Sequence, residues 1–197
     1  MPVKNTIKSY DAPAFYHLYT RGVAGMPVFL ADDDRRKFIE IIARHLDKNL
    51  ETDYPYEKYD VELIAYCLMG NHIHFLVYAP DDGHEITRFT RSLFTAYSMY
   101  FNRKYKRHGH LFESVFKAAH ITREPHLAHI TRYIHMNPRT YRTYKWSSIR
   151  YYTGESAPGW LHPERVLDMT PTQYLNFLAS YEGRKAELEL LKNSIAG

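Results

Sequence analysis

The stretch VELIAYCLMGNHIHFLVYA, residues 61–79, constrains the fold more than any other part of this chain. It contains two runs of apolar and β-branched residues, VELIAYCLM and HIHFLVYA, with only Gly-Asn between them. Runs of this length and composition are typical of strands, and a short connection through Gly-Asn favours an antiparallel hairpin. The chain is therefore expected to build a sheet in which these two strands are neighbours.

The second strand of this hairpin carries two histidines on one face. Successive residues of a strand point to opposite faces, so His72 and His74 share a face with their Cα atoms about 6.5 Å apart, whereas Ile73, Phe75 and Val77 face apolar packing. Each neutral imidazole needs both a donor and an acceptor as partners, which a buried strand rarely supplies twice. Two imidazoles at this separation can converge on one metal ion, and we expect a metal site here.

The other hydrophobic patterns place the hairpin in a larger α+β domain. They predict a strand over residues 15–22, a helix with an Asp-rich start over 32–46, and the hairpin over 61–79. A long amphipathic helix over 86–105, a strand over 115–122 and a further helix over 124–137 follow. This order indicates a ferredoxin-like fold, in which helices flank a mainly antiparallel sheet. We expect the domain to span residues 1–152, and residues 153–197 to form a linker and a C-terminal helical extension.

Charge is distributed unevenly along the chain. Residues 86–154 hold 13 Lys and Arg against two acidic residues, a charge of +11, whereas the whole chain carries +4 and the rest of it therefore sums to −7. The same segment holds eight of the 18 tyrosines. Cations that meet phosphates, interleaved with rings that stack on bases, are typical of proteins that bind single-stranded nucleic acid.

Neither a leader nor a membrane span is expected. The first 20 residues lack an apolar signal segment, and no apolar run approaches the roughly 18 residues that cross a bilayer. Cys67 is the only cysteine and lies in an apolar strand, so we expect a buried free thiol in a reducing compartment. These features predict a cytoplasmic protein.

The helix predicted over residues 124–137 can supply further ligands to a metal at the histidine pair. A row of polar side chains follows one edge of its apolar stripe: His126, His129, Tyr133 and Asn137. Tyr133 and Asn137 lie one turn apart, so a helix packed across the histidines would bring a phenol and an amide oxygen to the metal together. A tyrosine hydroxyl becomes a nucleophile at neutral pH when a metal such as Mg²⁺ or Mn²⁺, or nearby cations, polarises its target.

Ordered motifs in this chain resemble those of one family. The resemblance is to the HUH single-tyrosine transposases, and most of all to the REP-associated tyrosine transposases, and it rests on FYHLYTRGVAGMPVF, GNHIHFLV, YSMYFNRKYKRHGHLFESVFK, HITRYIHMNP and KWSS. These motifs lie within about residues 13–152. HUH denotes two histidines separated by a hydrophobic residue, here His72, Ile73 and His74. The resemblance implies the HUH endonuclease fold.

The resemblance also implies a role for each residue of the expected site. His72 and His74 would bind a divalent cation, Mg²⁺ or Mn²⁺, with Asn137 as the third ligand. Tyr133 would attack the scissile phosphorus of single-stranded, hairpin-flanked DNA, leaving a 5′-phosphotyrosine link and a free 3′-hydroxyl, and reversal by another 3′-hydroxyl would complete DNA transposition. Related insertion-sequence enzymes act as dimers and the REP-associated group as monomers, so both a monomer and a homodimer are compatible with the motifs.

The cations expected to contact DNA lie in these motifs and in the basic segment. They are Arg21, Arg88, Arg91, Arg103, Lys104, Lys106, Arg107, Lys117 and Arg132. One position departs from the family pattern, because an Arg usually precedes the Phe-Lys pair where this chain has Val115. A phosphate contact from that position is therefore in question, whereas Lys117 remains.

Two other functions are compatible with parts of the pattern. Basic ferredoxin-like sheets also bind RNA or DNA through aromatic side chains without any chemistry, but the paired histidines and Tyr133 favour an enzyme. A two-histidine phosphoesterase needs two His-x-Thr motifs; residues 120–122 supply one, but neither His72 nor His74 is followed by a Thr two residues later. We therefore expect a metal-dependent endonuclease and strand transferase, with a non-catalytic nucleic-acid-binding module as the alternative.

Overall fold

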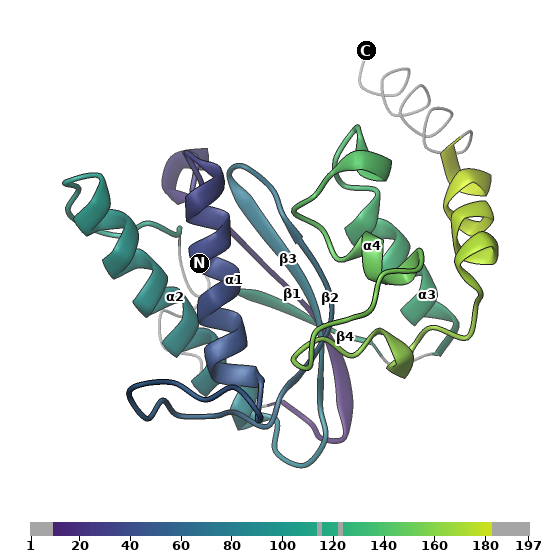
Figure 1. Ribbon diagram of the computed structural model, residues 1–197, viewed down its shortest axis with the longest axis horizontal. Coiled ribbons are helices and arrows are strands. Elements are labelled where there is room, and N and C mark those ends of the chain that lie inside the picture. The colour runs from purple at the N-terminus through teal and green to yellow at the C-terminus, as the bar shows by residue number, and fades with distance from the viewer. Residues whose placement is uncertain (1–9, 114–115, 122–123, 183–197) are drawn as a thin grey trace, which may run out of the picture.

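The computed structural model describes residues 10–113, 116–121 and 124–182 (Figure 1). Its strands are β1 (Ala14–Arg21), β2 (Glu62–Leu68), β3 (His72–Ala79) and β4 (Lys117–Ile121). Its α-helices are α1 (Asp32–Leu46), α2 (His84–Lys104), α3 (Glu124–His135) and α4 (Ile149–Tyr152), followed by helical residues 171–182. Three short 3-10 turns are η1 (Val23–Gly25), η2 (Tyr141–Thr143) and η3 (Pro163–Arg165). The predicted elements up to residue 137 are present with shifted boundaries, while Val115 and residues 183–197 lie outside the described residues.

The four strands form one sheet in the order β2-β3-β1-β4, and all three neighbouring pairs are antiparallel. α1 connects β1 to β2, and these two strands run parallel with β3 between them. α2 connects β3 to β4, and these two strands run parallel with β1 between them. This is the ferredoxin-like arrangement that the element order predicts. Residues 69–71 form the turn of the β2–β3 hairpin, and the Gly70 carbonyl accepts hydrogen bonds from the backbone N–H groups of Val28 and Phe29 at 2.8 and 3.2 Å.

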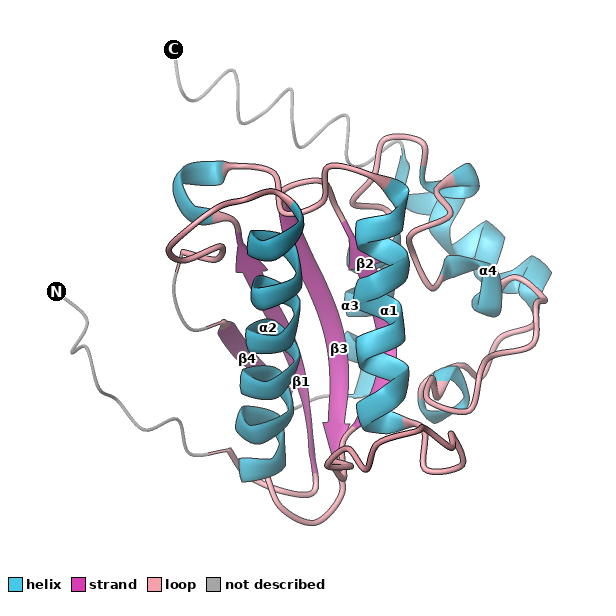
Figure 2. Ribbon diagram, turned by 60° about the vertical axis from the view of Figure 1, so that its left-hand side comes forward, coloured by secondary structure: helices cyan, strands magenta, loops and turns pink. Residues whose placement is uncertain are grey.

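Helices cover both faces of the sheet. α1 and α2 lie side by side across one face, and α3, α4 and residues 171–182 lie on the other (Figures 1 and 2). α3 contacts β2, β3 and β4. β3 lies inside the sheet, so one set of its side chains faces α1 and α2 and the alternate set faces α3.

An aromatic core fills the space between the sheet and the α1/α2 pair. Phe38 of α1, Phe75 of β3 and Tyr97 of α2 are each at most 1% exposed. The rings of Phe38 and Tyr97 meet edge to face with centroids 4.9 Å apart, and the Tyr97 hydroxyl donates to the Val28 carbonyl at 2.6 Å. The stripe predicted for α2 is thus confirmed. None of the described helices, α2 included, is both long and apolar enough to cross a membrane.

A buried carboxylate ties the start of α1 to the end of α2. Asp34 is fully buried, and it accepts hydrogen bonds from the backbone N–H groups of Leu30 and Ala31, both at 2.8 Å, and from the Tyr105 hydroxyl at 2.9 Å. Lys104 Nζ donates to the same carboxylate at 2.6 Å. Burial raises the pKa of Asp34, but the hydrogen bonds outweigh burial and hold that pKa below its ordinary value. The carboxylate therefore stays charged and paired.

The opposite face is closed by α3 and by the C-terminal part of the described chain. The KWSS segment lies along the outer edge of β2, where the Ser148 N–H donates to the Tyr66 carbonyl at 3.0 Å. Tyr174, from helical residues 171–182, packs in the same apolar cluster as Ile134 of α3. Within the predicted C-terminal extension, residues 171–182 form a helix, and a domain boundary after residue 152 stays a prediction.

Candidate active site

His72 and His74 lie on the face of β3 that α3 covers, as the strand alternation predicts. His72 is half-buried, and its Nδ1 lies 2.7 Å from Asn71 Oδ1, to which it donates. His74 is buried, and its Nδ1 lies 3.1 Å from Nε2 of His17 on the neighbouring strand β1. Partners of this kind fix the tautomer and orientation of metal-binding histidines. Each Nδ1 is thus engaged, and the Nε2 atoms are left for Asn137 and for a ligand.

Burial keeps the two inner imidazoles neutral. It lowers the pKa of His17 to about 4. It also lowers the pKa of His74 to about 3, with smaller contributions from the neighbouring His17 and His72. A neutral imidazole carries one N–H and one lone pair. When His74 donates its Nδ1–H to His17, its Nε2 lone pair is available to bind a cation.

α3 packs across the histidine face and brings Tyr133 and Asn137 over the histidines, which is the condition that the sequence left open. Asn137 follows the last turn of α3, and its Oδ1 and Nδ2 lie 3.0 Å from His72 Nε2 and 3.4 Å from His74 Nε2. Tyr133, one turn earlier, is 51% exposed. Its ring stands edge-on to those of His74 and His17, with centroids 5.5 and 5.7 Å away. The phenol and the amide therefore meet at the histidine pair.

The two Nε2 atoms and the Asn137 amide oxygen form a donor set that suits a divalent cation. With its Nδ1–H donated to Asn71, a neutral His72 turns its Nε2 lone pair toward Asn137 Oδ1, which is also an acceptor. Two such acceptors need a cation or a proton between them. Neighbouring ligands about 2.1 Å from an octahedral ion lie about 3 Å apart, which matches this pair. Among the described residues no three His, Cys, Asp or Glu side chains form a metal-binding group.

A cleft of about 580 Å³ opens over these atoms. It is lined by Tyr19, Thr20, Arg21, Asn71, His72, His74, Glu113, Lys117, Tyr133 and Asn137. Two cations expected to contact DNA, Arg21 and Lys117, are exposed here, and Lys117 Nζ lies 5.6 Å from the centroid of the Tyr19 ring. The cleft thus offers positive charge and an exposed aromatic ring next to Tyr133, which suits a phosphodiester and an adjacent base.

Three of the other expected cations are engaged within the protein. Arg88 forms ion pairs with two glutamates, one on α2 itself and one before β2. Lys104 holds the buried carboxylate at the start of α1. Arg132 stacks on the rings of Phe177 and Tyr181, with centroids 4.4 and 4.1 Å from its guanidinium carbon. These cations contribute to packing, and DNA contacts from them stay predictions.

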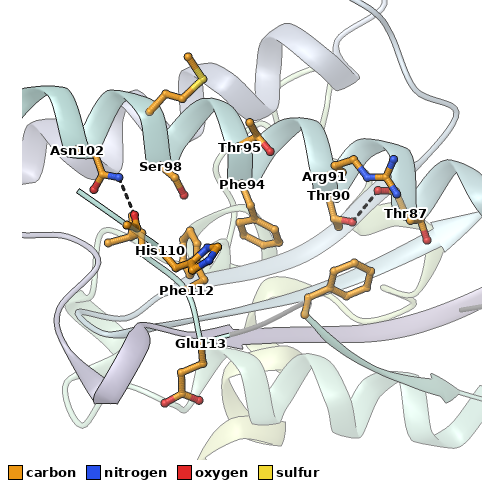
Figure 3. A pocket seen from close by; sticks show the side chains of 14 residues that line it. Thr87, Thr90, Arg91, Phe94, Thr95, Ser98, Asn102, His110, Phe112 and Glu113 are labelled. Atoms are coloured by element: carbon orange, nitrogen blue, oxygen red, sulfur yellow. Dashed lines mark hydrogen bonds between the residues drawn. The ribbon is translucent and has the colours of Figure 1, made fainter. Parts of the chain in front are cut away.

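The remaining expected cations follow α2 and the turn after it. A second cleft, of about 670 Å³, runs along α2 over an aromatic floor and shares Glu113 with the first (Figure 3). Arg91 lines it. Arg103 and Arg107 line an adjoining hollow near the end of α2, and Lys106 is exposed beside them. Cations of the basic segment, residues 86–154, therefore line both clefts, Lys117 the first and Arg91 the second.

His17 and Tyr19 also belong to the site, although the sequence pattern alone does not predict this. These two residues lie two positions apart in YHLYTR, so they share a face of β1. The register of β1 against β3, which sets Tyr19 opposite His74, shows that this is the face that carries the histidines. His129, which the sequence places along the same edge of the helix as Tyr133, packs against Phe177 of the C-terminal helical segment. The side chain of His126 lies outside the described residues.

Comparison with known proteins gives the family. The family described as "Transposase IS200 like" matches residues 28–137, more than half of the chain. The chain belongs to the IS200-like transposase family. A solved structure of the REP-associated tyrosine transposase bound to a REP hairpin matches with a TM-score of 0.56 and 14% identity, over 86% of this chain and 96% of that one. The fold class and the family predicted from the motifs are confirmed.

A second solved structure extends this comparison. It is a protein from Deinococcus radiodurans, named as a candidate transposase, which matches with a TM-score of 0.42 and 20% identity over 66% of this chain and 95% of that chain. No curated protein sequence matches this chain.

Proposed function

We propose that this protein is a metal-dependent single-stranded DNA endonuclease and strand transferase with Tyr133 as its nucleophile. The observation that carries the proposal is the place of Tyr133, which is exposed, edge-on to His74 and one turn before Asn137, whose amide meets both His72 and His74. A phenol that can reach a phosphate held beside a cation is what phosphoryl transfer to tyrosine requires. Membership of a transposase family supports DNA as the substrate.

His72, His74 and Asn137 would hold the divalent metal, Mg²⁺ or Mn²⁺. Oxygen ligands suit both ions, and a site with three protein ligands leaves positions for water and phosphate oxygens. When bound, the ion would neutralise the negative charge that develops on the phosphoryl oxygens and the leaving group. Asn71 and His17 would keep the two imidazoles oriented through their Nδ1 atoms.

Cleavage would exchange one phosphodiester for another. The Tyr133 oxygen forms a bond to the scissile phosphorus while the bond from phosphorus to the 3′-oxygen breaks. The phenol proton is released, and the departing 3′-oxygen takes up a proton, so the products are a 5′-phosphotyrosine and a free 3′-hydroxyl. A 3′-hydroxyl of another strand then attacks the same phosphorus and Tyr133 leaves. The strands are rejoined without an external energy source because the bond energy is kept in the intermediate.

The DNA would lie across both clefts. Arg21 and Lys117, which line the first cleft, would contact the phosphates next to the scissile bond. The cations along α2 would contact DNA farther away: Arg91, Arg103, Lys106 and Arg107. The structural relative is described as bound to a REP hairpin, which supports hairpin-forming DNA as the substrate here.

Covalent capture separates this function from a nucleic-acid-binding module without chemistry. The protein is incubated with Mn²⁺ and a library of hairpin oligonucleotides with randomised single-stranded flanks. The label is at the 3′ end, because the downstream fragment stays attached to tyrosine. We expect an adduct on a denaturing gel that is absent in Tyr133→Phe. Tyr19→Phe, which removes a hydroxyl from the same cleft, is the matched control and should retain it.

Two outcomes would contradict the proposal. An adduct of wild-type yield in Tyr133→Phe would overturn the assignment of the nucleophile. A wild-type protein that binds the hairpins tightly and never forms an adduct would instead be the non-catalytic module.

A further inference from the structure

A buried histidine anchors the helix that carries the proposed nucleophile. His135 is 0% exposed, and at 100° per residue it points away from the side of α3 that carries Tyr133 and Asn137. Its Nε2 lies 2.7 Å from Ser148 Oγ, and its Nδ1 lies 2.7 Å from the Tyr174 hydroxyl oxygen. The side chain is therefore held at both ring nitrogens by residues from outside α3.

Both partners of His135 are themselves fixed. Ser148 Oγ accepts a hydrogen bond from the Tyr66 N–H of β2 at 2.9 Å and lies 3.3 Å from the Tyr66 carbonyl. Tyr174 is 1% exposed, and its ring packs against those of Tyr152 and Phe177, with centroids 5.0 and 6.1 Å away. A continuous series of hydrogen bonds thus runs from the sheet through α3 to the C-terminal helical segment.

The hydrogen bonds around His135 form a consistent series. A neutral imidazole offers one donor and one acceptor. When the Tyr174 hydroxyl donates to Nδ1, the His135 Nε2–H donates to Ser148 Oγ, whose own hydroxyl donates to the Tyr66 carbonyl. Every donor then has an acceptor. Rotation of α3 would leave these buried groups unpaired, so the arrangement resists it.

We propose that His135 is a positioning residue, which fixes the rotation of α3 through Ser148 and Tyr174 and thereby aims Tyr133 and Asn137 at the histidine pair. The proposal rests on the function proposed above, because it is the nucleophile that the positioning serves. Residues on opposite sides of a helix move together when the helix turns, so holding His135 holds both. A displacement of about 1 Å at a reacting group can lower a rate about 100-fold. The KWSS and RYIHMNP motifs thereby meet at one contact.

Two neighbouring tyrosines offer a matched pair of substitutions. Tyr174 and Tyr152 are each 1% exposed, and their ring centroids lie 5.0 Å apart. The Tyr152 hydroxyl donates to the Ile64 carbonyl of β2 at 2.9 Å, so it ties α4 to the sheet, while its ring, which Phe keeps, packs edge to face against His135. Tyr174→Phe and Tyr152→Phe each delete one buried hydroxyl from the same apolar cluster, but only the first cuts the series through His135.

The test compares the rate of adduct formation at saturating DNA with DNA affinity and thermal stability in the full chain. Tyr174→Phe is expected to slow the rate about 10- to 100-fold with DNA affinity nearly unchanged. Tyr152→Phe is expected to keep the wild-type rate at a similar loss of stability. Equal slowing in both variants, or a wild-type rate in Tyr174→Phe, would overturn the positioning role. The Tyr133→Phe experiment above tests the nucleophile separately.

A spectroscopic measurement tests the same role without relying on catalysis. 3-Fluorotyrosine placed at position 133 reports on the orientation of that ring, because the imidazoles of His17 and His74 lie against its edge. The fluorine resonance is expected to shift or broaden in Tyr174→Phe and to stay in place in Tyr152→Phe. An unchanged resonance in Tyr174→Phe overturns the inference even in a protein that forms no adduct.

Discussion

The two faces of the sheet use the same strands for different purposes. On the α1/α2 face, β3 and β1 present apolar side chains such as Phe75 and Leu18, which are 1% and 2% exposed. On the α3 face, the alternate positions carry His17 and His74, with His72 at the open end. Because side chains alternate along a strand, one strand can supply both a hydrophobic core and a reactive site.

The difference between the faces lies in what their polar atoms touch. On the α1/α2 side the main buried charge, Asp34, is held by several donors and points at no cleft. On the α3 side, His72 Nε2 lies 3.0 Å from Asn137 Oδ1 at the edge of a cleft, and Tyr133 opens to solvent. The buried charge on the first face is paired within the protein, whereas under the proposed function a cation and a substrate would complete the second. Proteins often depart from ideal packing in this way at functional sites.

Alanine substitution of two adjacent residues of β3 should show the difference between the two faces most clearly. Phe75→Ala removes a buried ring on the α1/α2 face and is expected to lower the free energy of unfolding by about 3–5 kcal/mol. His74→Ala removes a proposed ligand on the other face, so Mn²⁺ binding should be lost while the free energy of unfolding falls by less. Urea unfolding and calorimetric Mn²⁺ titration of both variants measure this. Wild-type Mn²⁺ affinity in His74→Ala would contradict the proposal that the α3 face holds a metal through His74.

A smaller effect is expected from the partner of His74 on β1. His17→Phe keeps a ring of similar shape but removes the acceptor for His74 Nδ1, and loss of such partners typically weakens metal binding about 10- to 100-fold. Tyr16→Phe, which removes a hydroxyl from the other face of β1, is the control and should leave Mn²⁺ affinity unchanged. Equal Mn²⁺ affinities in all three proteins would show that His17 does not orient the ligand.

The smallest effect concerns two adjacent cations at the end of α2. Arg103→Gln, at an exposed position, is expected to reduce the slope of log DNA affinity against log salt by about 0.7. Lys104→Gln should leave that slope nearly unchanged and lower stability instead, because Lys104 holds Asp34. DNA binding measured at several salt concentrations, with urea unfolding, checks both. A slope reduced only in Lys104→Gln would reverse the assignment.

Local periodicity was sufficient for most of the fold. The apolar stripe of α2 and the alternation in β3 fix which side chains face the core, and the order of elements then leaves few topologies. The spacing of Tyr133 and Asn137 is local too, so their joint approach to the histidines follows once α3 covers that face.

Contacts between distant segments could not be predicted in this way. The role of Lys104 depends on Asp34, and that of His17 depends on which strand lies beside β3. Arg132 looks like a free cation in the sequence, but aromatic rings from helical residues 171–182 stack on it. Periodicity carries no information on such pairs, because each is set by the packing of elements that are far apart in the chain.

The most direct test of the account is to identify the residue that carries DNA after covalent capture. Trypsin places Tyr133 in the peptide of residues 133–139 and Tyr19 in that of residues 9–21, so mass spectrometry distinguishes them. Tyr19 is the stringent competitor, because it is 38% exposed and its ring lies 6.1 Å from that of His74. The account predicts a nucleotide adduct on Tyr133 alone. DNA attached to Tyr19, or to any other tyrosine, would contradict it.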